Sequence, residues 1–212
     1  MMHPAEALEI LRQYRQKGQP GSEETSVYSE LCKLLPTATA EDIQTLGPVL
    51  GVLIPELQPL LKFDQCSPHH AYDLYTHVSY VVERVPADLT LRWAALLHDI
   101  GKIPTFTRDA TGRGHFYGHA QAGAAMAEAV LTRLNAPETL KKQVVDLIGN
   151  HMTKLKTEEQ LRQQVDNLGW ETVDRLLSLQ EADMRSKGVD EPLPLEQFPQ
   201  LRQLLNQMKT ET

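Results

Sequence analysis

The sequence has few cysteines, few aromatic residues and no long apolar run, and each shortage excludes a class of protein. Two cysteines in 212 residues cannot form a disulfide framework, and their spacing suits neither a zinc site nor a redox pair. Phe, Trp and Tyr make up 6% of the chain and strict alternation is rare, which argues against an all-β fold. The longest apolar stretch, residues 46–55, contains Pro48 and is shorter than the ~20 residues that span a bilayer. We therefore expect no transmembrane helix.

The chain also lacks an excess of positive charge. Its 21 Lys and Arg residues and 28 Asp and Glu residues give a formal net charge of −7. This charge opposes strong non-specific binding to nucleic acid, so any such contact must be local. Glu6 and Glu9 lie where a secretory leader would need basic and apolar residues. We therefore expect a cytoplasmic protein with no membrane partner, and its oligomeric state stays open.

Helical periodicity is abundant. Apolar residues recur at spacings of three and four in successive segments that are bounded by Gly, Pro or capping residues. The pattern predicts an all-α fold, with a small N-terminal helical subdomain at residues 1–60, a central bundle at 61–188 and a tail helix at 189–212. We expect the helix that contains residues 74–85 to have Ser67 as its N-cap and Pro68 as its first position. Residues 104–118 are expected to form a Gly-rich, mobile loop.

Polar side chains fall on the apolar faces of these helices. They are His77, His98, His119, His151 and Asp183. A single inward histidine is more often a hydrogen-bonded core residue than a ligand. Burial of five such groups is costly unless they are paired or bind a metal, and helix bundles build metal sites from inward side chains. Mixed imidazole and carboxylate ligands suit Fe, Mn, Zn, Ni or Co better than calcium.

The order and context of these residues resemble the HD superfamily of metal-dependent phosphohydrolases. Four residues of its motif are present in order, namely His77, His98, Asp99 and Asp183. The stretches LLHDIGKIPTF, GRGHFYGHAQAGA and FDQCSPHHAYDLYTH are more narrowly similar to the HD domain in the C-terminal part of bacterial tRNA nucleotidyltransferases, the CCA-adding enzymes. The close match covers about residues 55–184.

The resemblance implies an HD-domain helical bundle that hydrolyses phosphoesters with one or two divalent ions, which are Fe, Mn, Mg, Ni, Co or Zn. It assigns four ligands to one ion, namely His77, His98, Asp99 and Asp183. In the superfamily's two-metal members the paired aspartate, here Asp99, bridges to a second ion that residues in the positions of His119 and His151 bind. Two ions would activate a water molecule and stabilise the leaving oxygen. Asp99 would therefore be catalytic.

Four further residues are candidates for substrate contact. Lys102 of the HDIGK motif is predicted to place a positive charge on a phosphate oxygen as a catalytic and substrate-binding residue; the alternative is a solvated cation at a helix end. Arg113 is a candidate phosphate clamp, or an ordinary loop arginine. His115 and His70 are candidates for the substrate pocket, or surface residues.

Three functions remain open. The first is hydrolysis of a phosphoester in a nucleotide, a cyclic nucleotide or an RNA 3′ end, and the complete ligand set favours it. The second is a non-catalytic tRNA-binding or structural module of a CCA-adding enzyme. The third is a helical protein-interaction or signalling module. Nothing in the sequence resembles the polymerase head of a CCA-adding enzyme, so we expect a free-standing relative or the tail of a longer protein.

Overall fold

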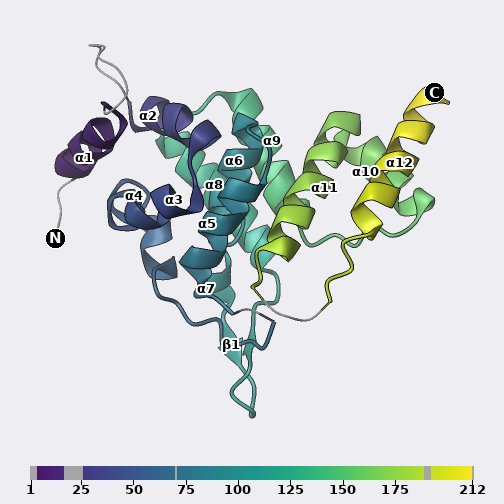
Figure 1. Cartoon of the computed structure of the whole chain (residues 1–212), viewed down its shortest axis with the longest axis horizontal. Helices are drawn as coiled ribbons and strands as arrows, with labels where there is room; N and C mark the ends of the chain where they lie inside the picture. Colours follow the sequence, from purple (N-terminus) through teal and green to yellow (C-terminus); the bar gives the residue numbers. More distant parts are fainter. Residues whose placement is uncertain (1–3, 17–25, 70, 189–191, 212) are drawn as a thin grey trace.

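In the computed structural model the chain folds into helices packed around one core (Figure 1). The structure describes residues 4–16, 26–69, 71–188 and 192–211. These residues form twelve α-helices, two short 3-10 helices and one two-stranded hairpin, which confirms the all-α prediction. Within the same residues, no helix combines the length and the apolar character needed to cross a membrane.

The elements follow one another along the chain with short connections. The helices are α1 (Pro4–Gln16), α2 (Val27–Leu34), η1 (Leu35–Thr37), α3 (Ala40–Thr45), α4 (Gly47–Leu53), η2 (Pro55–Leu60), α5 (Leu74–Arg84), α6 (Leu89–Leu97), α7 (Lys102–Thr105), α8 (His119–Arg133), α9 (Glu138–Asn150), α10 (Glu158–Leu168), α11 (Trp170–Arg185) and α12 (Gln197–Thr210). The antiparallel strands are β1 (Thr107–Arg108) and β2 (Gly114–His115).

Five helices, α5, α6, α8, α9 and α11, form the central bundle. α5 packs on α6, α6 on α9, α9 on α8, and α11 on α5, α6 and α9. The apolar stripe of α5 explains this packing, since Val78, Val81 and Val82 are fully buried. The N-terminal helices α1 to α4 lie on one side of this bundle, and α10 and α12 lie on the other (Figure 1). One hydrophobic cluster includes residues from Ala7 to Met208, so the three predicted segments share a core, and their division stays a prediction.

The start of α5 differs from the prediction. Ser67 and Pro68 precede the helix by several residues, and Asp73 is the N-cap. The Asp73 carboxylate accepts hydrogen bonds from the backbone N–H of Thr76 at 3.0 Å and from the Thr76 hydroxyl at 2.7 Å. Two bonds to one residue of the first turn make Asp73 a stronger cap than a lone serine hydroxyl. The prediction for Ser67 and Pro68 is therefore wrong.

The Gly-rich segment between α6 and α8 is more ordered than the sequence pattern indicates. It contains the short helix α7 and the β1–β2 hairpin, in which Thr107 pairs with His115. One carboxylate organises the turn, because Asp109 accepts hydrogen bonds from the backbone N–H groups of Thr111 at 2.9 Å and Arg113 at 3.1 Å. Its other oxygen lies 2.8 Å from Nε2 of His115. Residues 107–115 are therefore a structured hairpin.

Gly101 allows a close contact between the turn after α6 and the start of α8. Its φ angle is −70°, which any residue adopts, so space and not backbone conformation requires glycine. A Cβ at this position would clash with the carbonyl oxygen of His119 and with the backbone N of Gly123. Both obstacles are backbone atoms, which cannot rotate away. The glycine therefore holds the His98–Asp99 turn against the helix that begins at His119.

Candidate metal centre

Six imidazole and carboxylate side chains meet at the centre of the bundle. They come from α5 (His77), the turn after α6 (His98 and Asp99), the first residue of α8 (His119), the residue after α9 (His151) and the last turn of α11 (Asp183). The ligand atoms of His77, His98 and Asp183 all lie within 4.8 Å of one another, and those of Asp99, His119 and His151 do the same. The structure thus brings together all six predicted ligands in two groups that are able to hold a metal ion.

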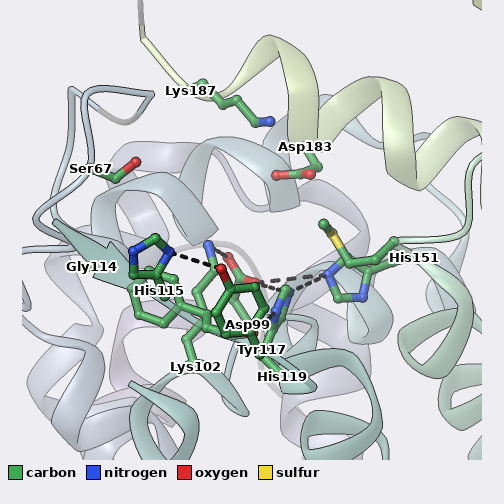
Figure 2. A pocket seen from close by; sticks show the side chains of 12 residues that line it. Ser67, Asp99, Lys102, Gly114, His115, Tyr117, His119, His151, Asp183 and Lys187 are labelled. Atoms are coloured by element: carbon green, nitrogen blue, oxygen red, sulfur yellow. Dashed lines mark hydrogen bonds and ion pairs between the residues drawn. The ribbon is translucent and has the colours of Figure 1, made fainter. Parts of the chain in front are cut away.

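The carboxylate of Asp99 lies between the two groups. Its Oδ2 is 3.5 Å from Nε2 of His77 and 3.2 Å from Nε2 of His98. Its Oδ1 is 3.6 Å from Nε2 of His119 and 3.9 Å from Nε2 of His151. Figure 2 shows Asp99 next to His119, with His151 farther along the same side. One oxygen therefore faces each group, which is the arrangement that a bridging carboxylate needs.

The second ring nitrogen of every histidine faces a backbone carbonyl. The Nδ1 to O distances are 3.1 Å from His77 to Ser186, 2.8 Å from His98 to Ala95, 2.8 Å from His119 to Phe116 and 2.7 Å from His151 to Ile148. A carbonyl oxygen only accepts, so each Nδ1 must donate its proton. In a neutral ring this leaves the lone pair on Nε2, which is the tautomer of histidines that bind metals through Nε2.

Burial and charge prepare the ligands for a cation. Burial lowers the pKa of His119, and burial together with the nearby His98 lowers the pKa of His151 to about 4. Both rings are therefore neutral at pH 7 and able to ligate. Burial by itself would raise the pKa of Asp99, but the positive charges of His98 and Lys102 outweigh it and hold that pKa well below its usual range. The carboxylate is thus ionised.

A divalent ion fits this set of residues. Nε2 of His98 is buried and has no hydrogen-bond partner within the described part of the chain. A buried polar atom without a partner is costly, and a metal ion would satisfy it. The ligand set contains only imidazole nitrogens and carboxylate oxygens, which suits first-row transition metals.

Lys102 is buried beside Asp99. It is 6% exposed, and its Nζ lies 2.8 Å from Oδ2 of Asp99 and 2.9 Å from Oε1 of Gln65. The same Nζ lies 5.3 Å from the centre of the Phe116 ring. The alternative of a solvated cation is therefore wrong, because the ammonium group is enclosed by its partners.

A pocket of about 240 Å³ opens over the ligand groups. Asp99, Asp183 and Lys102 form part of its lining, and the predicted His115 lies in its wall. Ser67 and His115 lie on one side and His151 on the other (Figure 2). Arg113 is exposed and is not among the described residues that line the pocket, so its phosphate contact stays a prediction. His70 lies outside the described residues.

Sequence reasoning missed three pocket residues, namely Ser67, Tyr117 and Lys187. The Tyr117 side chain is 80% exposed and its ring stacks on that of His115, with 5.4 Å between the ring centres. Lys187 follows Asp183 by four residues, so its helical spacing was a usable signal. No comparable signal marks Ser67, because it reaches the pocket through the path of the segment before α5.

Comparisons with known proteins agree with this geometry. The chain matches the HD domain family over residues 69–194. It is 37% identical over 147 residues to the A-adding tRNA nucleotidyltransferase of Deinococcus radiodurans, an alignment that covers 66% of this chain and 33% of that protein. It is 32% identical over 150 residues to the CC-adding tRNA nucleotidyltransferase of Thermus thermophilus, covering 67% and 34%. It is 39% identical over 106 residues to the multifunctional CCA protein of Azoarcus sp., covering 48% and 25%. The chain thus spans about a third or less of the length of these relatives.

Proposed function

The chain belongs to the HD domain family, as its motifs predict, and from this premise we propose that it is a metal-dependent phosphohydrolase. Its substrate would be a phosphoester of a nucleotide, a cyclic nucleotide or an RNA 3′ end. The observation that carries the proposal is an open pocket directly over six convergent ligands. Structural metal sites are closed, whereas catalytic sites keep an open position for the reacting group. A bound divalent ion supplies Lewis-acid activation of water and of a phosphoryl oxygen.

The residues of this chain have distinct roles in the proposal. Asp99 bridges the two ligand groups and is the central catalytic residue. Lys102 fixes the orientation of the Asp99 carboxylate through its 2.8 Å contact and adds positive charge below the pocket. His115 and Lys187 place donors at the pocket wall, where phosphate oxygens would lie. We also propose that the HD domain occupies residues 61–188, between the subdomain at 1–60 and the tail at 189–212; the match at residues 69–194 supports this.

A second function, a non-catalytic tRNA-binding or structural module, has one observation in its favour. The relatives from Deinococcus radiodurans and Thermus thermophilus are named as tRNA nucleotidyltransferases. If this chain serves a similar protein, tRNA would be its partner, and the metal would be retained for stability alone. The open pocket and the bridging position of Asp99 favour the hydrolase.

Metal content and turnover measured together test the two functions. We expect the purified protein to bind one or two equivalents of a divalent metal, and to hydrolyse a phosphomonoester or a 2′,3′-cyclic nucleotide. A chelator should abolish turnover, and added metal should restore it. Bound metal without turnover of either substrate would favour the structural module. Absence of metal binding would contradict both functions.

Substitution of His119 separates the two ligand groups. His119→Ala is expected to remove one metal equivalent and most of the turnover, because its Nε2 faces Asp99 and lies 3.1 Å from Nε2 of His151. The fold should be retained, as judged by circular dichroism. The exposed His69 offers a matched control, since His69→Ala should change neither quantity. Unchanged stoichiometry and rate in His119→Ala would place His119 and His151 in the substrate pocket of a one-metal enzyme.

Substitution of Arg113 tests the predicted phosphate clamp. We expect Arg113→Ala to raise KM for a nucleoside phosphate with a smaller effect on kcat, because the guanidinium would bind ground and transition states alike. Arg113 is exposed, so the effect should fade as salt rises above ~0.1 M, where charges ~10 Å apart are screened. Arg162→Ala on α10 is the control for the lost charge. A KM that is unchanged at every ionic strength would show that Arg113 does not contact substrate.

A further inference from the structure

A second groove of about 330 Å³ adjoins the pocket over the metal centre. Four residues line both spaces, namely His151, Met152, Asp183 and Lys187. From there the groove, which we call the flanking groove, runs over residues 152–156 and reaches the start of α12 at Gln197 and Phe198. A molecule held at the ligand groups would therefore extend into it without leaving the protein surface.

The flanking groove is positively charged in a negatively charged chain. Lys154, Lys156 and Lys187 line it, and among its described lining residues the only carboxylate belongs to the ligand Asp183. Neither Lys154 nor Lys156 forms an ion pair within the described ranges of the chain, and both are exposed. The net charge of the whole chain is −7. The local excess of cations thus favours an anionic occupant.

The floor of the flanking groove is apolar and held in place. Met152 is 58% exposed, and Met184 and Phe198 lie farther along the same lining. The side chain of Gln180 donates hydrogen bonds to the carbonyl oxygens of His151 at 3.0 Å and Thr153 at 2.7 Å. These two bonds fix the groove wall relative to a metal ligand. Flat apolar surface next to cations is what nucleotides use, because bases stack while phosphates pair with Lys.

We propose that the flanking groove binds the nucleotide next to the reacting phosphate, so that the substrate class is an oligoribonucleotide end and not a free mononucleotide. This inference rests on the proposed function, which places the reacting phosphate over Asp99. Lys154 and Lys156 then pair with the following phosphate, and Met152 contacts its base. An acidic peptide would match the charge but would leave the apolar floor and the continuity with the metal centre unused.

Binding of an oligonucleotide to the metal-loaded protein tests this assignment apart from catalysis. The probe is a 5′-labelled pentaribonucleotide with a terminal phosphorothioate, followed by fluorescence anisotropy and displaced by the corresponding mononucleotide. We expect the pentanucleotide to bind at least about tenfold more tightly, since an added stacked base and an added phosphate contribute 1–3 kcal/mol. Lys154→Gln combined with Lys156→Gln should remove most of this advantage. It should also reduce the slope of log Kd against log salt by about 0.7 per lysine.

The control pair is Lys141→Gln with Lys142→Gln, which removes the same charge from α9 outside the groove. Equal affinity for both ligands, equal losses in the two double variants, or equal competition by polyglutamate would each overturn the assignment. Turnover of a 2′,3′-cyclic mononucleotide, measured in parallel, separates the two proposals. Turnover without tighter oligonucleotide binding would overturn the groove assignment alone. Lysine-dependent oligonucleotide binding without any turnover would overturn the hydrolase and support the groove.

Discussion

Asp99→Ala is expected to reduce turnover to background and to release metal from both ligand groups. The reason is that Oδ2 faces His77 and His98 while Oδ1 faces His119 and His151, so no other side chain contacts both groups with separate oxygens. The change also leaves the Lys102 ammonium group buried without its carboxylate partner. Breaking a buried ion pair in this way costs about 3–5 kcal/mol of stability.

The effect on metal and the effect on folding are separable. Asp99→Asn keeps the shape of the side chain and removes its charge, so it should retain more stability than Asp99→Ala while turnover stays at background. Metal analysis, turnover and thermal unfolding of both variants measure this. Asp146→Asn, which removes a carboxylate on the surface of α9, serves as the control and should resemble the wild type. Full metal content in Asp99→Ala would contradict the bridging role.

Gly101→Ala is expected to destabilise the protein strongly for so small a change. The added Cβ would meet backbone atoms of His119 and Gly123, which can move only by shifting α8. Overpacking of this kind costs about 1–3 kcal/mol, and a backbone obstacle places the cost near 3 kcal/mol. For a chain of this size that corresponds to a melting temperature about 6 to 12 °C lower. Metal affinity should fall too, because the shift separates His119 from Asp99.

Gly149→Ala is the matched control for this experiment. Its Cβ would lie 3.6 Å from Cβ of Ala124, which is an ordinary contact. Replacing a helical glycine by alanine stabilises a helix by up to about 1 kcal/mol. Thermal unfolding should therefore show Gly149→Ala equal to or more stable than the wild type. If Gly101→Ala unfolds at the wild-type temperature, the close contact between the Asp99 turn and α8 does not hold in solution.

The metal ligands were predictable because each is tied to a local pattern. His77 and Asp183 occupy apolar stripes at helical spacing, and His98 with Asp99 carries the family motif. The periodicity therefore indicated which side chains point inward before any contact was known. The all-α fold followed from the same signal.

The pocket wall was less accessible to sequence reasoning because tertiary contacts build it. Ser67 and Lys187 come from segments 120 residues apart, and no local pattern relates them. Lys102 lies at a helix start and looks exposed in the sequence, but Asp99 and Gln65 enclose it. The hairpin was missed because the side chain of Asp109, and not an alternating apolar pattern, organises it.

The carbonyl groups that face the four imidazole rings differ in their distance along the chain. For His98, His119 and His151 the carbonyl belongs to the residue three positions earlier, so each ring is oriented by its own turn of backbone. His77 instead faces Ser186, 109 residues away, beyond the end of α11. Three ligands are therefore oriented as soon as their local turns form, whereas the fourth waits for α11 to pack against α5. A chain cut before Ser186 would keep three oriented rings and lose the first ligand, so the metal centre is completed only at the last step of assembly.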